Sequence, residues 1–208
     1  MTEARMAAPE LEAVEIHGMS RSSFILRGAV ATGAVFGAGA VTPFVRQAFA
    51  QSGGGDVDVL NFALTLEYLE AAFYKQAASA KLSSSVAKLA KEFGAQEQEH
   101  VTTLMATIKK LGGKPVAAPG VNFGSLKDEK TVLKLAVAFE DTGVSAYNGA
   151  APSIKSKEVL GAAGSIVQVE ARHAAAIRLA AGMDPSPLAF DKTLSMAEVL
   201  KAVKPYVK

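Results

Sequence analysis

From Asp56 onward, apolar residues recur at steps of three and four along four long segments of the chain. This spacing is that of an α-helix with one buried face, so the pattern predicts four amphipathic helices and an all-α fold. Ser84 or Ser85 is suited to cap the second helix, and Ser156 the fourth. The positions that form the four stripes are Leu60, Leu64, Glu67, Ala71, Tyr74 and Ala78; Val86, Leu89, Phe93, Glu97, His100 and Leu104; Leu133, Val137, Glu140, Val144 and Tyr147; and Val159, Ala163, Ile166, Glu170, His173 and Ile177.

The connections between these segments are unequal in length. Residues 81–86 and 152–157 are short, so the helices that they join should be antiparallel neighbours. Residues 111–127 contain two prolines and four glycines and predict a loop that is long enough to cross the whole bundle. After Met183 the pattern changes, and a short helix is expected near 195–203. The chain should therefore form two helical hairpins, a crossover loop and a short C-terminal helix.

Each apolar stripe contains a glutamate, and two stripes also contain a histidine three residues after it. A carboxylate in an apolar stripe is costly unless its charge is neutralised, and four together would repel one another strongly. Glu and His at this spacing face the same side of a helix and offer one oxygen and one nitrogen ligand per turn. A pair of divalent cations would resolve the repulsion. The candidate metal ligands are Glu67, Glu97, His100, Glu140, Glu170 and His173.

The candidate ligands repeat along the chain at one offset, 73 positions (140 minus 67). Such a repeat indicates an internally duplicated helical hairpin. The midpoints between the two glutamates of each hairpin fall in the short turns, so both glutamates of a hairpin should lie at the same height. The corresponding pairs are Glu67 and Glu140, Tyr74 and Tyr147, Glu97 and Glu170, and His100 and His173.

The repeat also separates the candidate ligands from neighbouring polar residues. Glu70, Glu99 and Asp141 have no acidic counterpart, so we interpret them as solvated residues or as residues that support the ligands. Tyr74 and Tyr147 each follow a candidate glutamate by two helical turns. Each could hydrogen-bond a metal ligand, or could simply fill the core.

Composition excludes several other kinds of site. The chain has no cysteine, so disulfides, thiolate-bound zinc and iron–sulfur clusters are excluded. Its net charge is +2 and its basic residues are scattered, which argues against nucleic-acid binding. The 208 residues suffice for one well-formed core.

The N-terminal residues have the features of an export signal. Arg21 and Arg27 precede an uncharged stretch, 28–45, which is followed by Ala48-Phe49-Ala50, a pattern expected before a signal-peptidase site. The segment resembles a twin-arginine signal, with Ser22 where the second arginine would stand; an uncleaved membrane anchor is the alternative. Export predicts a periplasmic or extracellular protein. The expected divisions are an export signal over 1–50 cleaved after Ala50, a linker over 51–56, a four-helix bundle over 57–182 and a C-terminal tail with a short helix over 183–208.

One glutamate from each of two helices, with Glu-x-x-His from each of the other two, resembles the ferritin-like superfamily of di-iron and di-manganese carboxylate proteins. Residues 61–74, "NFALTLEYLEAAFY", further resemble exported bacterial ferritin-like proteins related to plant desiccation-associated proteins. The resemblance implies a ferritin-like antiparallel four-helix bundle that holds two Fe or Mn ions. It also implies these ligand roles: Glu97 and Glu170 bridge the ions, Glu67 and His100 complete one position, and Glu140 and His173 complete the other.

The resemblance favours an exported oxidoreductase whose partners are metal ions and O2 or peroxide, with any reductant supplied from outside. It would act as a ferroxidase or a peroxide-detoxifying enzyme. A manganese catalase-like activity is a close variant. The non-catalytic alternatives are metal storage, which would require a homo-oligomeric shell, and a structural, stress-protective role of the desiccation type. Neither nucleic acid nor, once the signal is cleaved, a membrane is expected as a partner.

Overall fold

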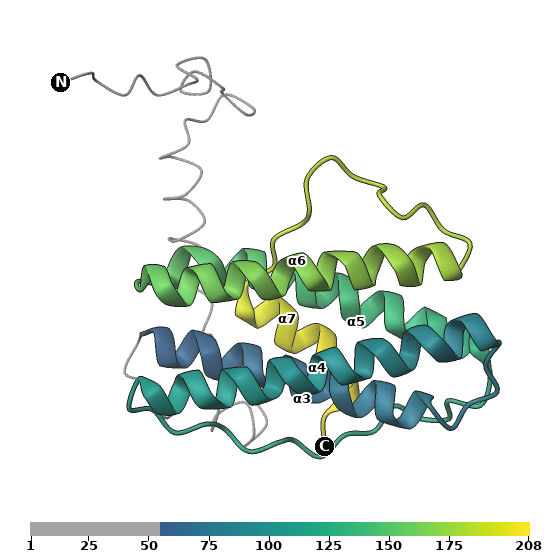
Figure 1. Ribbon diagram of the computed structural model, residues 1–208, viewed down its shortest axis with the longest axis horizontal. Coiled ribbons are helices and arrows are strands. Elements are labelled where there is room, and N and C mark those ends of the chain that lie inside the picture. The colour runs from purple at the N-terminus through teal and green to yellow at the C-terminus, as the bar shows by residue number, and fades with distance from the viewer. Residues whose placement is uncertain (1–54) are drawn as a thin grey trace. The chain divides into compact units, whose positions relative to one another are not determined.

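The structure is a computed structural model and describes residues 55–208. The expected export signal and most of the expected linker lie outside these residues. The described part is all-helical, with four long helices in two packed pairs followed by a short helix (Figure 1). This confirms the predicted fold class. The helices are α3 (Asp56–Ala77), α4 (Ser84–Lys110), α5 (Glu129–Ala150), α6 (Lys157–Ala180) and α7 (Met196–Val203), with short 3-10 helices η2 (Ala151–Ser153) and η3 (Lys204–Tyr206).

Serine caps define the starts of α4 and α6. The Ser156 side chain accepts a hydrogen bond from the Val159 N–H at 3.3 Å, as predicted. The cap of α4 is Ser83, so the prediction of Ser84 or Ser85 was wrong. Three consecutive serines have the same capping chemistry, and only the backbone shows that Ser83 alone is extended, with Ser84 already helical.

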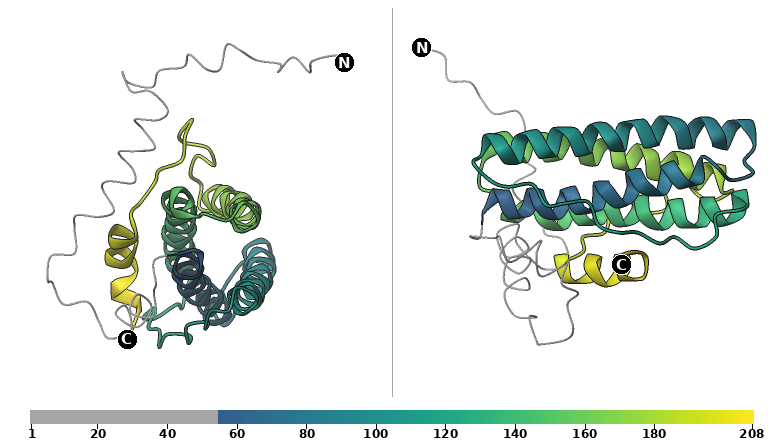
Figure 2. Two further views of the ribbon diagram at one scale, coloured as in Figure 1. Left: turned by 90° about the vertical axis from the view of Figure 1, so that its left-hand side faces the viewer. Right: turned by 90° about the horizontal axis from the view of Figure 1, so that it is seen from below.

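The crossover between α4 and α5 runs the length of the bundle (Figure 2). The Asn61 side chain anchors it by donating to the Lys114 carbonyl at 3.2 Å and accepting from the Val116 N–H at 2.9 Å. Phe123 and Leu126 of the crossover are buried in the core. These contacts hold the long loop against the helices.

The C-terminal tail covers one side of the bundle. Helix α7 lies beside α3 and α5, on the side away from α4 and α6 (Figure 2), and buries Val199 and Val203 in the same apolar cluster as Leu69 of α3. The tail also meets the crossover, where the Asn122 N–H donates to the Tyr206 carbonyl at 2.9 Å.

This cover changes the expected burial of the first helix. Helix α3 is buried on nearly all sides between Val59 and Leu66, so a single stripe was too narrow a prediction. The stripe was also one residue too long, because α3 ends at Ala77 and Ala78 is an exposed capping residue. The reason is that α3 packs against α4, α5, the crossover and the tail together.

Two apolar clusters make up the core of the bundle. Along α3, Leu64 belongs to one cluster and Leu69 to the other, with Glu67 between them. Along α4, Phe93 and Val101 are divided in the same way around Glu97. A polar layer therefore crosses the middle of an otherwise apolar core. Among residues 55–208, no helix has the length and apolar character required to span a membrane.

Candidate metal centre

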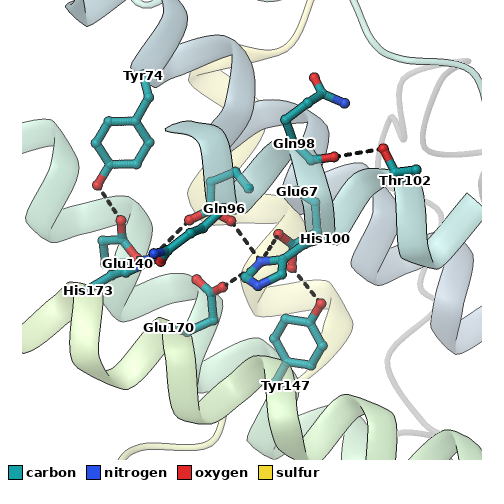
Figure 3. A network of polar contacts seen from close by, with 11 residues as sticks. Glu67, Tyr74, Gln96, Gln98, His100, Thr102, Glu140, Tyr147, Glu170 and His173 are labelled. Carbon is teal, nitrogen blue, oxygen red and sulfur yellow. Dashed lines mark hydrogen bonds and ion pairs between the residues drawn. The ribbon is translucent and has the colours of Figure 1, made fainter. Parts of the chain in front are cut away.

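Each of the four long helices contributes one fully buried glutamate to this polar layer (Figure 3). The glutamates come from successive helices, and α4 and α6 each add a histidine from the next helical turn on the same face. The side chain of His100 is 12% exposed and that of His173 is 2% exposed. The structure thus brings together all six residues selected from the sequence: Glu67, Glu97, His100, Glu140, Glu170 and His173.

The first cluster gathers around His100. Its Nδ1 lies 3.1 Å from Glu67 Oε2, 3.1 Å from Glu97 Oε2 and 3.2 Å from Glu170 Oε1. One potential ligand atom from each of these four residues lies within 4.8 Å of the others. The cluster therefore draws on three different helices.

The second cluster gathers around His173. Its Nδ1 lies 2.9 Å from Glu97 Oε1 and 3.4 Å from Glu140 Oε2. With Glu170, these residues again offer ligand atoms that all lie within 4.8 Å of one another. Glu97 and Glu170 belong to both clusters. Two buried carboxylate–histidine clusters that share two glutamates are consistent with a di-metal site.

The unpaired atoms of this layer test whether a metal pair fits. Buried polar atoms in proteins almost always have a hydrogen-bond partner. Here Glu97 Oε1, Glu140 Oε2, both carboxylate oxygens of Glu170 and His173 Nδ1 are buried without one, because the ion-pair contacts among them and with His100 lack hydrogen-bond geometry. All of them belong to the second cluster, and they form the oxygen and nitrogen donor set that Fe and Mn accept. The residues therefore fit a cation.

Two tyrosines support the glutamates from the opposite hairpin. The Tyr74 hydroxyl of α3 donates to Glu140 Oε1 of α5, and the Tyr147 hydroxyl of α5 donates to Glu67 Oε1 of α3 at 2.5 Å. Both tyrosines are buried. Each tyrosine thus orients the candidate ligand of the other hairpin: Tyr74 orients Glu140, and Tyr147 orients Glu67.

Burial and mutual contact shift the protonation of the layer strongly. Burial by itself would raise the pKa of Glu97, but contacts with His100 and His173 lower it to about 2. Burial raises the pKa of Glu140 to about 8, against the effect of His173. Burial also lowers the pKa of the histidines, yet contacts with the carboxylates raise it to about 12 for His100 and about 10 for His173. Carboxylates and protonated histidines therefore stabilise one another here.

Of the two interpretations offered for Glu70, a solvated residue or one that supports the ligands, the first was wrong. Glu70 is not solvated: it is 3% exposed, and its Oε2 has no hydrogen-bond partner. Burial, followed by the charge of Glu170, raises the pKa of Glu70 well above its usual value. Its counterpart in the repeat is Gly143, where an added Cβ would lie 3.0 Å from Glu70 Oε1 and 3.3 Å from Glu170 Oε2. The missing side chain of Gly143 leaves room for both carboxylates, a signal that the sequence contained.

The other polar neighbours are resolved more simply. Glu99 is exposed. Asp141 accepts two hydrogen bonds from the Arg178 guanidinium, at 3.0 and 2.6 Å. Sequence reasoning missed Gln96, whose Oε1 lies 2.6 Å from His173 Nε2. A glutamine directly before a candidate ligand has no distinctive spacing, so only the structure shows this contact.

Comparisons with known proteins agree with this architecture. A protein-family model described as "Ferritin-like domain" matches residues 55–183. Among solved structures, a similar chain comes from the "Crystal structure of ferritin like, diiron-carboxylate proteins from Bacillus anthracis str. Ames". The two chains are 19% identical with a TM-score of 0.55, and the match covers 68% of this chain and 99% of that one. At this identity the likeness shows the fold alone. The comparison with curated proteins finds no match.

Proposed function

Because the chain belongs to the ferritin-like domain family, we propose that it binds two Fe or Mn ions in the buried layer and acts as an oxidoreductase toward O2 or peroxide. The observation that carries this proposal is the pair of four-residue clusters that share Glu97 and Glu170. Sharing two carboxylates is what holds two cations close enough to act on one small molecule.

The charge of the layer supports a pair of divalent ions. The four glutamates that make up the two clusters, when ionised, carry the charge that two divalent cations would balance. Glu67 and His100 would hold one ion, while Glu140 and His173 would hold the other. Glu97 and Glu170 would contact both. Neutral histidine and ionised carboxylate together form a donor set that suits iron and manganese alike.

When bound, the pair of ions would supply one electron each, so that one peroxide molecule takes up two electrons and two protons and leaves as two water molecules. The protein's part is to hold and shield the site. Tyr74 and Tyr147 fix the orientation of two carboxylates through their hydroxyl groups. The apolar clusters around the layer shield it from bulk water except where the histidines line the groove between α4 and α6.

A groove between α4 and α6 offers a route for small reactants. It has a volume of about 590 Å³, and both histidines line it together with Phe93, Ile166 and Val169. The opposite side of the bundle is covered by α7. The groove therefore supports access to the layer from one side.

The proposal includes location outside the cytoplasm, supported by the resemblance of residues 20–51 to an export signal. Cell fractionation of the full-length protein tests it. We expect the shortened chain outside the cytoplasm, and a chain of full length that stays in the cytoplasmic fraction would contradict it.

The function is tested by metal content and turnover of the purified full-length chain. After separate loading with Fe(II) and Mn(II), elemental mass spectrometry should find about two ions per chain, as a two-metal site requires. Fe(II) oxidation by O2 or peroxide is then followed by absorbance, and peroxide dismutation by the Mn-loaded protein by oxygen release. Glu97→Ala should abolish binding and turnover, whereas Glu99→Ala, an exposed acid on the same helix, should change neither.

The outcomes separate the candidate functions. Rapid Fe(II) oxidation supports a ferroxidase or peroxide-detoxifying enzyme, and oxygen release with manganese supports a catalase-like one. Two tightly bound ions without turnover would exclude the enzyme and leave metal binding. If neither metal binds, the di-metal proposal fails.

A further inference from the structure

The two histidines differ in the contacts of their second ring nitrogen. His173 Nε2 lies 2.6 Å from Gln96 Oε1, so this nitrogen donates its proton to the amide oxygen. The position that corresponds to Gln96 in the second hairpin is Val169, which has no hydrogen-bonding side chain. Within residues 55–208, the hydrogen bonds of His100 are made by Nδ1 alone. Of the two histidines, only His173 therefore has a hydrogen-bond partner on Nε2, the nitrogen that does not contact the carboxylates.

The two histidine rings also differ in the side chains that pack against them and in their exposure to solvent. The Phe93 ring stacks on His173 with centroids 3.9 Å apart and planes at 22°. The counterpart of Phe93 is the aliphatic residue Ile166. Both histidines line the groove between α4 and α6, but the side chain of His173 is only 2% exposed whereas that of His100 is 12% exposed. His100 is thus the histidine that solvent reaches.

The four candidate ligand glutamates are supported alike in the two halves, although the buried Glu70 has only Gly143 as its counterpart. Tyr74 supports Glu140, and Tyr147 supports Glu67 in the same way. The other two glutamates are shared by both clusters. Among residues that contact the candidate ligands directly, Gln96 and Phe93 make the two positions differ, because both contact His173 and neither has a like counterpart at His100.

These contacts have a direct physical effect on metal binding. A hydrogen bond from Nε2 fixes the ring orientation and leaves the Nδ1 lone pair free for a cation. Losing such a partner typically lowers metal affinity by about 10- to 100-fold. A buried, stacked ring must also disrupt its packing before it can turn away from an ion, whereas His100 can move into the groove.

We infer that the two metal positions hold their ions unequally. The ion at Glu140 and His173 is retained, and the ion at Glu67 and His100 exchanges with solvent through the groove. Gln96 is the positioning residue that sets this difference. The inference rests on the proposed di-metal function and adds to it which position exchanges its ion.

The test is a chelator challenge of the full-length protein loaded with Mn(II). Metal remaining on the protein is measured by elemental mass spectrometry at successive times after excess chelator is added. The wild type should lose its metal in two phases of about one ion each, as two unequal sites require. In Gln96→Val, which copies the residue of the other hairpin, the slow phase should become about 10- to 100-fold faster while the fast phase stays unchanged.

Three further variants separate positioning from general damage. Gln96→Glu keeps an oxygen acceptor for His173 and should preserve the slow phase. Gln98→Val, the same change at an exposed site on α4, should alter neither phase. Val169→Gln gives His100 the partner that it lacks and should slow the fast phase. Circular dichroism checks that each variant keeps its helix content.

The outcomes also separate this inference from the function on which it rests. Loss of both ions in a single phase from the wild type overturns the inference and leaves the di-metal function intact. So does an unchanged slow phase in a folded Gln96→Val variant. Failure of the wild type to bind Mn(II) or Fe(II) overturns the proposed function, and the inference with it.

Discussion

The α3–α4 and α5–α6 hairpins carry the same glutamates, histidine and tyrosine at the same spacing, yet their immediate surroundings differ. The first hairpin has Gln96 where the second has Val169, and Phe93 where the second has Ile166. The candidate metal ligands and the two tyrosines are identical in the two hairpins, whereas Gln96 and Phe93, which contact His173, differ from their counterparts. A site built by duplication can therefore be symmetric in its ligands and asymmetric in how firmly each is held.

The largest effect on metal binding is expected when a residue that belongs to both clusters is removed. Glu97→Ala takes a carboxylate from both clusters, so metal content should fall from about two ions per chain to nearly none. Elemental mass spectrometry after loading measures this. Retention of one full ion would show that Glu97 serves one position only and that the two positions bind metal independently.

Removing one histidine should affect one half. His173→Ala and His100→Ala should each leave about one ion per chain, because each histidine belongs to a single cluster. Helix content by circular dichroism should largely survive in both variants, since the apolar stripes are unchanged. Full metal binding by His173→Ala would remove that residue from the ligand set.

Acid should weaken metal binding in both halves. A bound histidine must be neutral, yet contacts with carboxylates, opposed by burial, raise the pKa of His100 to about 12 and that of His173 to about 10. Metal uptake at neutral pH must therefore release protons, and affinity should rise with pH until these groups lose their protons. Calorimetry in buffers of different ionisation enthalpy counts the released protons. Uptake without proton release would contradict these assignments.

Glu70 and Gly143 occupy corresponding positions of the two hairpins, and their coupling can be tested through the free energy of unfolding. Gly143→Ala improves helix propensity by about 1 kcal/mol, but its Cβ would crowd Glu70 Oε1 at 3.0 Å. We expect no gain in the free energy of unfolding from this change alone and a gain of about 1 kcal/mol in a Glu70→Ala background. Chemical denaturation of the four proteins measures the coupling. Additive effects would mean that Gly143 does not make room for Glu70.

The smallest expected effect on metal is that of Glu70→Gln, which should leave occupancy at about two ions because the two clusters lack this residue. Its stability should nevertheless change with pH. Burial and the charge of Glu170 raise the pKa of Glu70 in the folded state, so the contribution of Glu70 to the stability of the metal-free wild type falls as pH rises above 4.5. The advantage of Glu70→Gln over wild type should grow over that range. Loss of metal from the variant would make Glu70 a ligand.

The four helices and the residues of the buried layer could be predicted because each depends on spacing along one helix. The residues that surround the layer depend on contacts between helices. Gly143 leaves room for the buried Glu70, and α3 is buried on nearly all sides because α4, α5, the crossover and the tail all pack against it. Gln96 was missed for the same reason: its partner, His173, lies on a different helix. Periodicity predicts which face of a helix is buried, but not which neighbour covers it.

The crossed tyrosine bonds bear on how such a protein could have arisen. Tyr74 reaches Glu140 and Tyr147 reaches Glu67, so each tyrosine hydroxyl serves a glutamate of the other hairpin. Two copies of a single hairpin, paired about a two-fold axis, would make this tyrosine–glutamate contact twice. Fusion of two such genes would preserve every contact while freeing each copy to mutate separately. The single chain thus has the reciprocal contacts expected of a two-fold dimer, while its two halves differ at Gln96 and Val169.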